Sequence, residues 1–398
     1  MVKTSVSQIK MPLTGNDAGA YAMKQVNPDV VAAYPITPQT ELMQTFAQYV
    51  HDGDVDTALI TVESEHSAMS ACIGAAAAGA RTMTATSANG FALMWEVLYI
   101  AASLRLPITM AVVNRALSGP INIHCDHSDS MGARDAGWIQ MYAENSQEAY
   151  DLWLIGIKAA ENHDVLLPAM IMYDGFIISH TMEVVETLPD DAVKDYVGPY
   201  KPAYAMLLDE KPFTVGPLDF HDYYFEHKRQ EIEGMEHAPA ALAAAATEYE
   251  KLSGRHYGPV ETYRADDADV IMVALGSTAG TARYVVDVLR DQGKSVGLMK
   301  LRNFRPFPHA EVADALGKTK CVVVCDRVAS FGAFGSPTFM ELRSALYEVP
   351  ERPPVINYIY GLGGRDTGPD LLEQAFEEGL RVARTGKIEQ HVSYLGVR

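Results

Sequence analysis

Apolar runs and alanine-rich segments alternate through the first 180 residues of the chain. The apolar runs contain few polar positions, which is typical of strands that are covered on both faces of a parallel sheet. The pattern predicts strands at residues 30–34, 58–62, 82–86, 108–113 and 166–173. It predicts helices at residues 16–25, 40–49, 67–79, 91–103 and 147–161. Strands that alternate with helices at this spacing indicate a parallel sheet with helices on both faces.

The alternation stops between about residues 181 and 264, where prolines punctuate a mixture of aromatic and charged residues. A long helix, first charged and then rich in alanine, is expected at residues 223–252. We interpret this segment as an extended arm and connector that can wrap a neighbouring subunit. A second, smaller α/β pattern begins near Ala268, with strands expected at residues 269–275, 295–300, 321–325 and 355–359. Its helices are expected at residues 282–292, 311–316, 338–346 and 369–382.

Composition and charge exclude several classes of protein. Of 398 residues, 48% are hydrophobic and 21% are charged, which is ordinary for a globular chain long enough for two or three domains. Acidic residues number 51 against 32 basic residues, and because Lys and Arg form no cluster, a nucleic-acid partner is not expected. The four cysteines are too few for a disulfide scaffold, and neither a signal peptide nor a membrane-spanning segment is found. We therefore expect a cytoplasmic protein without a membrane partner.

Polar side chains follow the predicted strands of the first unit at the points where those strands end. They lie in the segments 34–38, 63–66, 87–90 and 114–115. Parallel sheets bind ligands beyond the carboxyl ends of their strands. We therefore expect these segments to bring a carboxylate, a hydroxyl, an amide and a guanidinium together at one edge of the sheet. A guanidinium there suits a carboxylate ligand. The same residues would also serve as helix caps and loop formers, and spacing leaves both interpretations open.

Two clusters resemble metal or redox motifs. Residues 124–129 contain two His, one Cys and two Asp, but no second group of ligands follows at a zinc-like spacing. We interpret them as a polar loop that fixes Arg115 and its neighbours. Cys321 and Cys325 lie on one face of an apolar strand, where buried free thiols are expected rather than cluster ligands.

Two glycine-rich turns follow strands of the second unit. The turn at residues 276–281 resembles a phosphate-binding turn without completing a known motif, and close packing of helix on strand explains it equally well. The turn at residues 361–364 can be interpreted as a tight turn at a subunit contact rather than a ligand loop. A nucleotide-binding dehydrogenase built on the first turn is one alternative function.

Many longer motifs occur in a fixed order along both units. They read TGNDAGAYAMKQVNPDVVAAYPITPQTEL, VESEHSAMSACIGAAAAGARTMTATSANGFALMWE, VVNRALSGPINIHCDHSDSMGARDAGWIQ, GFIISHT, DYYFEHKRQ, KLRNFRPFP, SFGAFGSP and YGLGGRD. With these motifs the chain resembles the alpha subunits of the 2-oxoacid:ferredoxin oxidoreductase family, and pyruvate:ferredoxin oxidoreductase (pyruvate synthase) within it.

The resemblance implies a fold and a reaction. Residues 1–260 are similar to the parallel-sheet, thiamine pyrimidine-binding domain with its connecting arm (about 181–260), and residues 261–398 are similar to the smaller, transketolase-C-like α/β domain. The family oxidatively decarboxylates a 2-oxoacid with coenzyme A to an acyl-CoA and carbon dioxide, and it reduces ferredoxin. The reaction is reversible. Pyruvate is the expected substrate, and branched-chain 2-oxoacids or 2-oxoglutarate are the alternatives within the family.

The resemblance assigns the catalytic role to Glu65, which matches the glutamate that pairs with N1′ of the thiamine aminopyrimidine. A carboxylate hydrogen-bonded there favours the tautomer whose 4′-nitrogen takes the proton from the thiazolium C2. Glu63, two residues earlier at the strand end, is the competing carboxylate.

Four further residues carry over from the family. Thr37 and Arg115 match the threonine and arginine that bind the 2-oxoacid. Asn89 and Gly90 match positions near the cofactor pocket, although many relatives carry glutamine at the position of Asn89. The presence of Thr37, Glu65 and Arg115 together argues against a non-catalytic assembly subunit.

The resemblance also implies obligatory partners. The chain lacks the GDG…N signature for magnesium and diphosphate and the closely spaced cysteines of an iron–sulfur cluster. Thiamine diphosphate is therefore expected to be shared with a beta subunit. Mg²⁺ and 4Fe–4S clusters are expected in partner subunits, which include gamma and ferredoxin-like delta subunits or fusions of them. No metal ligands are expected in this chain.

Overall fold

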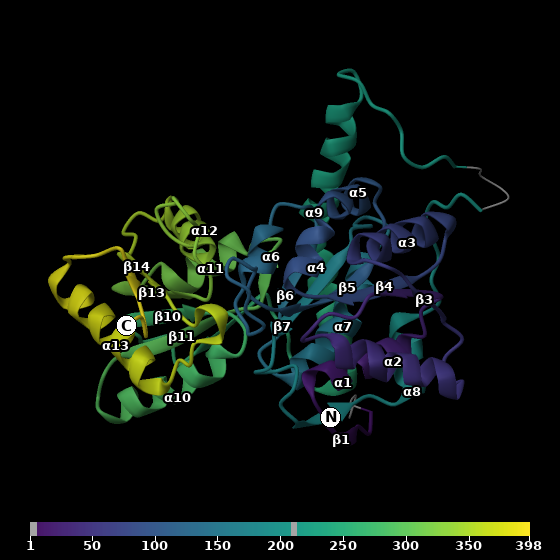
Figure 1. Cartoon of the computed structure of the whole chain (residues 1–398). Coiled ribbons are helices and arrows are strands. Elements are labelled where there is room, and N and C mark those ends of the chain that lie inside the picture. Colours follow the sequence, from purple (N-terminus) through teal and green to yellow (C-terminus); the bar gives the residue numbers. More distant parts are fainter. Residues whose placement is uncertain (1–5, 208–212) are drawn as a thin grey trace.

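The computed structural model describes residues 6–207 and 213–398, in two α/β units that lie side by side (Figure 1). Each unit has its own sheet, and most strand pairs in both sheets are parallel, as expected from the sequence. Residues 1–5 of the expected first domain and residues 208–212 of the expected arm lie outside the described residues.

The first sheet has the strand order β12-β6-β7-β5-β4-β2-β3. All of its neighbours are parallel except β12, which comes from the second unit and runs antiparallel to β6. The strands are β2 (Val30–Ala33), β3 (Ala58–Thr61), β4 (Thr82–Thr86), β5 (Thr109–Asn114), β6 (Ile139–Tyr142), β7 (Ala169–Asp174) and β12 (Asn303–Arg305). The carboxyl ends of the parallel strands therefore meet at one edge.

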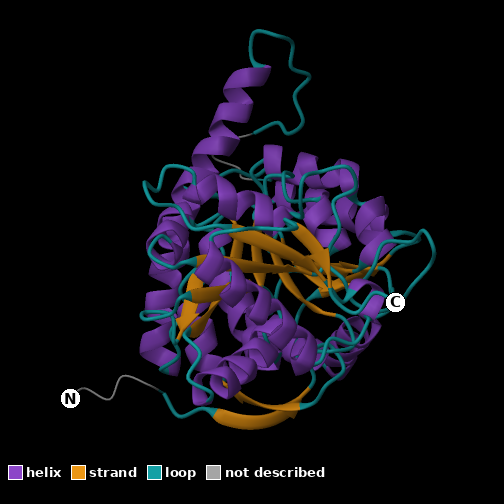
Figure 2. Ribbon diagram, turned by 90° about the vertical axis from the view of Figure 1, so that its left-hand side faces the viewer, coloured by secondary structure: helices purple, strands orange, loops and turns teal. Residues whose placement is uncertain are grey.

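Helices cover both faces of this sheet (Figure 2). Successive residues of β5 belong to opposite cores, because Met110 and Val112 pack on one face while Ala111 and Val113 pack on the other. One face is covered by α1 (Gly15–Val26), α2 (Thr40–Asp52) and α7 (Ser146–Ala160). The other face is covered by α3 (Glu65–Ala78), α4 (Ala88–Leu93) and α5 (Trp95–Ser103).

The arm contains one strand and two helices. Its strand, β8 (Glu183–Thr187), pairs antiparallel with β1 (Ile9–Leu13) from the N-terminal segment. Helix α8 (Asp190–Val197) follows, and the N-terminal turns of α9 (Tyr224–Ser253) project beyond the body of the molecule (Figure 1). A short helix, α6 (Ser128–Gly132), lies between β5 and β6.

The second sheet has the order β15-β14-β13-β10-β11-β9, with only β9 antiparallel. Its strands are β9 (Val260–Tyr263), β10 (Val270–Ala274), β11 (Val296–Leu301), β13 (Cys321–Asp326), β14 (Val355–Ile359) and β15 (Val392–Tyr394). Helices α10 (Thr278–Asp291) and α13 (Pro369–Thr385) cover one face. Helices α11 (His309–Leu316) and α12 (Pro337–Leu346) cover the other, and the core on this face continues into the first unit. A 3-10 turn, η1 (Leu362–Gly364), follows β14.

The predicted helices and strands are all present, with shifted ends. The helix expected at residues 67–79 begins two residues earlier, so that Glu65 is its first residue. The helix expected at residues 91–103 is two short helices with a break at Met94. Strands β1, β6, β8, β9, β12 and β15 were not predicted, and all of them are short.

Candidate active site

The residues predicted at the strand ends lie at the shared edge of the first sheet and form two contacting pairs. Arg115, directly after β5, donates from Nη1 to the backbone oxygen of Thr37, at 2.9 Å. Gly90 lies against the carboxylate of Glu65. Asn89 instead faces the loop after Arg115, where its Oδ1 accepts hydrogen bonds from the backbone N–H and hydroxyl of Ser118.

Glu65 is buried, and the helix capping is done by its neighbours. Ser64 caps α3 by accepting from the backbone N–H of Ser67. The competing carboxylate, Glu63, is exposed and accepts from the Ser67 hydroxyl, which lowers the pKa of Glu63. The carboxylate of Glu65 has no hydrogen-bond partner among the residues that the structure describes, although the residue is only 6% exposed. A buried carboxylate without a partner is costly unless a ligand supplies one.

Gly90 is a glycine because its backbone presses on that carboxylate. A Cβ atom at this position would lie 2.3 Å from Oε1 of Glu65 and 2.7 Å from its Cδ. A side chain fits here only if the Glu65 carboxylate moves. The pairing therefore fixes one side of Glu65 and leaves its remaining surface for a ligand.

The side chain of Arg115 is held by two carbonyl groups rather than by a carboxylate. Nε donates to the backbone oxygen of Asn122 at 3.0 Å, and Nη1 donates to that of Thr37. Nη2 has no hydrogen-bond partner within residues 6–207 and 213–398, and neither does the Thr37 hydroxyl. Thr37 is exposed, whereas Arg115 is buried. One edge of a fixed guanidinium and the hydroxyl of the residue whose carbonyl holds that guanidinium are thus available to a ligand.

Asp129 joins the ends of β4 and β5 and was not predicted as a site residue. Its Oδ2 accepts from the backbone N–H groups of Ala88 and Arg115, both at 3.0 Å. Its Oδ1 accepts from Asn114 Nδ2 and from the N–H of Ser130. Burial raises the pKa of Asp129 to about 6. The interpretation of residues 124–129 as a polar loop that fixes Arg115 is therefore confirmed.

The metal-like part of this loop lies against an ion pair that joins the two units, between Asp174 and Arg327. Ligand atoms of Cys125, His127 and Asp174 lie within 4.8 Å of one another. However, Arg327 Nη1 donates to Asp174 at 2.9 Å and to the sulfur of Cys125 at 3.7 Å. Although burial alone would raise it, Arg327 and His127 hold the pKa of Asp174 well below its usual range, while burial raises that of the Cys125 thiol. The guanidinium supplies the positive charge that a metal ion would otherwise bring to Asp174.

The glycine-rich turn at residues 276–281 also binds Asp174. Both the backbone N–H and the hydroxyl of Ser277 donate to its Oδ2. A Cβ at Gly276 would lie 3.0 Å from Oδ1. The anion held by this turn is an internal carboxylate, so the turn gives no support to a nucleotide-binding dehydrogenase.

The glycine-rich turn at residues 361–364 packs on the loop that carries Asn122. Gly364 donates its N–H to the backbone oxygen of Cys125 at 2.7 Å, and Asn122 Nδ2 donates to the oxygen of Gly363 at 3.0 Å. The turn is tight, as expected, but its contact lies between the two units of this chain; a contact with another subunit stays a prediction.

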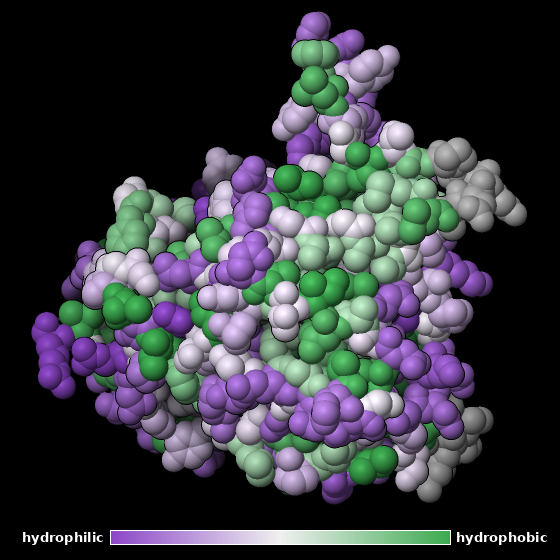
Figure 3. Space-filling view, turned by 45° about the vertical axis from the view of Figure 1, so that its right-hand side comes forward, coloured by the Kyte–Doolittle hydropathy of each residue, from purple (hydrophilic) through white to green (hydrophobic). Residues whose placement is uncertain are grey.

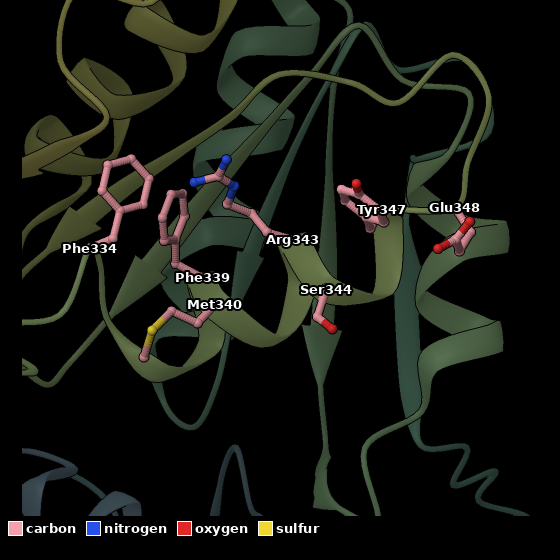
Figure 4. A pocket seen from close by; sticks show the side chains of 7 residues that line it. All are labelled: Phe334, Phe339, Met340, Arg343, Ser344, Tyr347 and Glu348. Atoms are coloured by element: carbon pink, nitrogen blue, oxygen red, sulfur yellow. The ribbon is translucent and has the colours of Figure 1, made fainter.

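Two remaining features carry no chemistry of their own. The four cysteines are free and buried, and burial raises the pKa of Cys72 and Cys321 to about 12. A hollow on α12 shares no residue with the strand-end site, and its guanidinium, Arg343, already lies over the rings of Phe334 and Phe339 (Figure 4). No helix in the described part of the chain combines the length and the apolar character needed to cross a bilayer.

Together these groups suit the binding and chemistry of an organic anion. A guanidinium edge and a hydroxyl can orient a carboxylate, and a buried carboxylate can hold a proton on a basic nitrogen of a ligand.

The exposed apolar side chains of β3, α4 and α5 lie on the same unit: Ile60, Leu93, Trp95 and Ile100. Figure 3 shows hydrophobic residues gathered over a large part of one face of the molecule.

Two family models match the chain. The model described as "Pyruvate flavodoxin/ferredoxin oxidoreductase, thiamine diP-bdg" matches residues 21–246. The model described as "Pyruvate:ferredoxin oxidoreductase core domain II" matches residues 268–372.

Curated relatives are similar along nearly their whole length. The chain is 56% identical to pyruvate synthase subunit PorA of Thermotoga maritima, covering 98% of each chain. It is 43% identical to the subunit of the same name from Pyrococcus furiosus, again over 98% of each. It is also 43% identical to ketoisovalerate oxidoreductase subunit VorA of Pyrococcus abyssi, over 97% of each.

Two solved structures share the fold. A 2-oxoglutarate:ferredoxin oxidoreductase from Magnetococcus marinus aligns with a TM-score of 0.71 at 20% identity, covering 94% of this chain and 65% of that longer chain. A split-gene transketolase, described as an inactive beta4 tetramer, aligns with a TM-score of 0.54 at 11% identity, covering 94% of this chain and 100% of that one.

Proposed function

Since the chain belongs to the pyruvate:ferredoxin oxidoreductase family, we propose that it is the alpha subunit of a complex that converts pyruvate and coenzyme A to acetyl-CoA and carbon dioxide and reduces ferredoxin. It is an oxidoreductase subunit with a thiamine diphosphate-binding domain. The same complex runs the reaction in reverse as a pyruvate synthase.

The observation that carries the proposal is the unpartnered carboxylate of Glu65, closed in by the backbone of Gly90. A thiamine aminopyrimidine needs a carboxylate that shares a proton with its ring nitrogen, and the described residues leave this one without a partner. When bound, thiamine diphosphate supplies a carbon nucleophile for the 2-oxo group and accommodates the electron pair that carbon dioxide leaves behind. The residues present therefore fit the pyrimidine half of this cofactor.

Each side chain of the site has one task in the proposed reaction. Glu65 holds the proton on the pyrimidine ring nitrogen, and Gly90 allows the α4 backbone to close on it. The free edge of Arg115 binds the carboxylate of pyruvate, because guanidinium and carboxylate form charge-assisted hydrogen bonds. Thr37 donates its hydroxyl to the substrate beside it. Asn89 orders the loop after Arg115 through Ser118.

Partner subunits complete the enzyme in this proposal. The described cysteines are buried and dispersed, so they do not suit cluster ligation. Mg²⁺ with the diphosphate and the 4Fe–4S clusters are assigned to a beta subunit and to gamma and ferredoxin-like delta subunits. The exposed apolar face on β3, α4 and α5 offers a surface on which one of them can dock. Buried free thiols fit a reducing cytoplasm.

We propose pyruvate, rather than a branched-chain 2-oxoacid, as the substrate. The pyruvate synthase subunit of T. maritima is 56% identical to this chain, against 43% for the ketoisovalerate relative. A comparison of turnover with pyruvate, 2-oxoisovalerate and 2-oxoglutarate on the purified complex tests this preference directly.

Two substitutions test the site in the purified complex, assayed by coenzyme A-dependent reduction of a viologen dye. Arg115→Ala should raise the KM for pyruvate about 10- to 100-fold, since a hydrogen bond to a charged group contributes roughly 1.5–3 kcal/mol. Thiamine binding should not change. Arg343→Ala, in the hollow of Figure 4, is the control and should leave KM unchanged. An unaltered KM in Arg115→Ala would refute the substrate clamp.

Glu65→Gln should abolish turnover while the complex still assembles, and exchange of the thiamine C2 proton should slow with it. Glu63→Gln is the matched control, because Glu63 is an exposed carboxylate two residues away. Retained C2 exchange in Glu65→Gln would rule out its catalytic role.

A further inference from the structure

A loop of the first unit, residues 122–126, lies between Arg115 and the second unit, and we name it the seam loop. On one side, the backbone oxygen of Asn122 accepts from Arg115 Nε at 3.0 Å. On the other side, the Asn122 side chain donates from Nδ2 to the backbone oxygen of Gly363 at 3.0 Å. One residue thus contacts both the guanidinium and the second unit.

Further hydrogen bonds fasten the seam loop to the second unit. Gly363 donates its N–H to Oδ2 of Asp126 at 3.1 Å, and Gly364 donates to the backbone oxygen of Cys125 at 2.7 Å. Within the loop, Oδ1 of Asn122 accepts from the N–H of His124 at 2.7 Å. The side chain of Asn122 therefore fixes the turn that presents its own carbonyl to Arg115.

The contact is closely packed at both glycines of the turn. Gly363 and Gly364 have φ of +59° and +76°. A Cβ on Gly363 would lie 2.4 Å from Nδ2 of Asn122, and one on Gly364 would lie 2.3 Å from Cβ of His124. Glycine is required at both positions for the backbone conformation and for the close approach. Because the two segments touch this closely and are hydrogen-bonded to each other, a shift of the second unit would move the seam loop with it.

Arg115 depends on this loop because it has no other rigid anchor on that side. It forms no ion pair with any described residue, and its side chain is aimed only by the carbonyls of Thr37 and Asn122. Two hydrogen-bonded nitrogens of a planar guanidinium fix the direction of the third. A shift of the Asn122 carbonyl would therefore turn the free Nη2 edge.

We propose that Asn122 is a positioning residue for pyruvate binding, through which the second unit sets the direction of the Arg115 guanidinium. The inference rests on the substrate role of Arg115 in the proposed function. Asn122 contributes no group to the substrate itself; its side chain holds the seam loop and its carbonyl holds Arg115.

The inference predicts a change in KM with little change in kcat. Asn122→Ala removes the tie to Gly363 and the turn within the loop, and it should raise the KM for pyruvate about five- to tenfold. Asn122→Asp keeps the acceptor for His124 but loses the donor to Gly363, so it should raise KM as well. Gly363→Ala pushes on Asn122 from the second unit and should have the same effect without altering any residue of the first unit.

A double-mutant cycle in the purified complex separates positioning from a general structural role. Asn122→Ala should add no further increase in KM once Arg115 is alanine, because both changes remove the same interaction. Arg283→Ala is the control: it breaks another contact between the units, with Glu144 at 2.6 Å, and should leave KM unchanged. Thermal unfolding of each variant reports whether the fold is retained.

Each outcome decides one point. A KM for pyruvate that is unchanged in Asn122→Ala, or that rises additively with Arg115→Ala, overturns the positioning role. If Arg115→Ala itself leaves KM unchanged, the proposed clamp fails and the positioning role fails with it. If Arg115→Ala raises KM and Asn122→Ala does not, only the positioning role is lost.

Discussion

Replacing Gly90 with alanine displaces the Glu65 carboxylate but removes no polar group from the site. The added Cβ would lie 2.3 Å from Oε1, 2.7 Å from Cδ and 2.8 Å from Cγ of Glu65, whereas ordinary contacts begin near 3.4 Å. The carboxylate must therefore retreat by about 1 Å, since the α4 backbone that carries Gly90 is buried and cannot move as easily as a side chain.

A displacement of this size has a large effect on catalysis and a smaller one on folding. A misplacement of about 1 Å at a reacting group costs roughly 100-fold in rate, which corresponds to about 2.7 kcal/mol of transition-state stabilisation. We expect kcat to fall by about this factor in the viologen assay with saturating pyruvate and coenzyme A. The C2 proton exchange of bound thiamine should fall in parallel, because Glu65 is assigned to that step.

Gly74→Ala is the matched control, on the helix that begins with Glu65. Gly74 is exposed, and a Cβ there meets no atom within 4 Å. Alanine should stabilise α3 by roughly 0.5–1 kcal/mol and leave kcat unchanged. If folded Gly90→Ala keeps kcat within about threefold of the wild type, the position of Glu65 does not limit turnover, and the reasoning fails.

Two predictions concern stability. Arg255→Met leaves the buried carboxylate of Asp151 without its ion-pair partner and should lower the free energy of unfolding in urea by about 3–5 kcal/mol. Arg264→Met, the control, breaks a half-exposed pair with Asp287 and should lower it by less than about 1 kcal/mol. Equal losses in the two variants would contradict this prediction. Burial raises the pKa of Asp129 from its ordinary 3.8 to about 6, so the stability that its proton contributes is complete below pH 4 and is lost as pH rises through 6. The free energy of unfolding of the wild type, measured relative to that of Asp129→Asn, should therefore fall by about 3 kcal/mol between pH 4 and 7. A difference between the two proteins that does not change with pH would refute the raised pKa of Asp129.

The sequence pattern predicted the strands that are buried on both faces and missed those that are not. Strands β5 and β7 are largely apolar runs, which is the pattern that burial between two helix layers requires, and β4 is equally buried although three of its five residues are threonine. Strand β6 was missed because Ile139–Tyr142 is short and contains the buried Gln140. Strand β12 has three residues and pairs with β6 across more than 160 positions, so no local pattern identifies it.

The strand-end rule brought the candidate site residues together because parallel strands share one edge. It brought Thr37 and Arg115 into contact correctly, although their hydrogen bond joins positions 78 residues apart. The choice of Glu65 over Glu63 needed the family resemblance, and burial supports the same choice. Asp174 was overlooked even though it ends β7, so applying the rule to that strand as well would have found it.

Contacts between the units could not be predicted because the residues that form them lie in no motif that marks them within their own segments. Asp174 and Arg327 are 153 positions apart, and neither lies in a recognisable motif. The glycines of the turn at residues 276–281 indicated an anion, and the anion is Asp174. A turn that binds an internal carboxylate and one that binds a phosphate use the same backbone N–H groups, so sequence alone does not distinguish them.

Arg115 has no carboxylate partner although acidic residues outnumber basic ones in this chain. With 51 acidic and 32 basic residues, the lack of such a partner does not reflect a shortage of carboxylates. The acidic group beside it, Asp129, is instead taken up by three backbone N–H groups and the side chain of Asn114. Asp129 thus orients Arg115 through its N–H and has its acceptor sites occupied. A buried guanidinium that is fixed by carbonyls, beside a carboxylate that is already satisfied, keeps its charge for an anion from outside the chain.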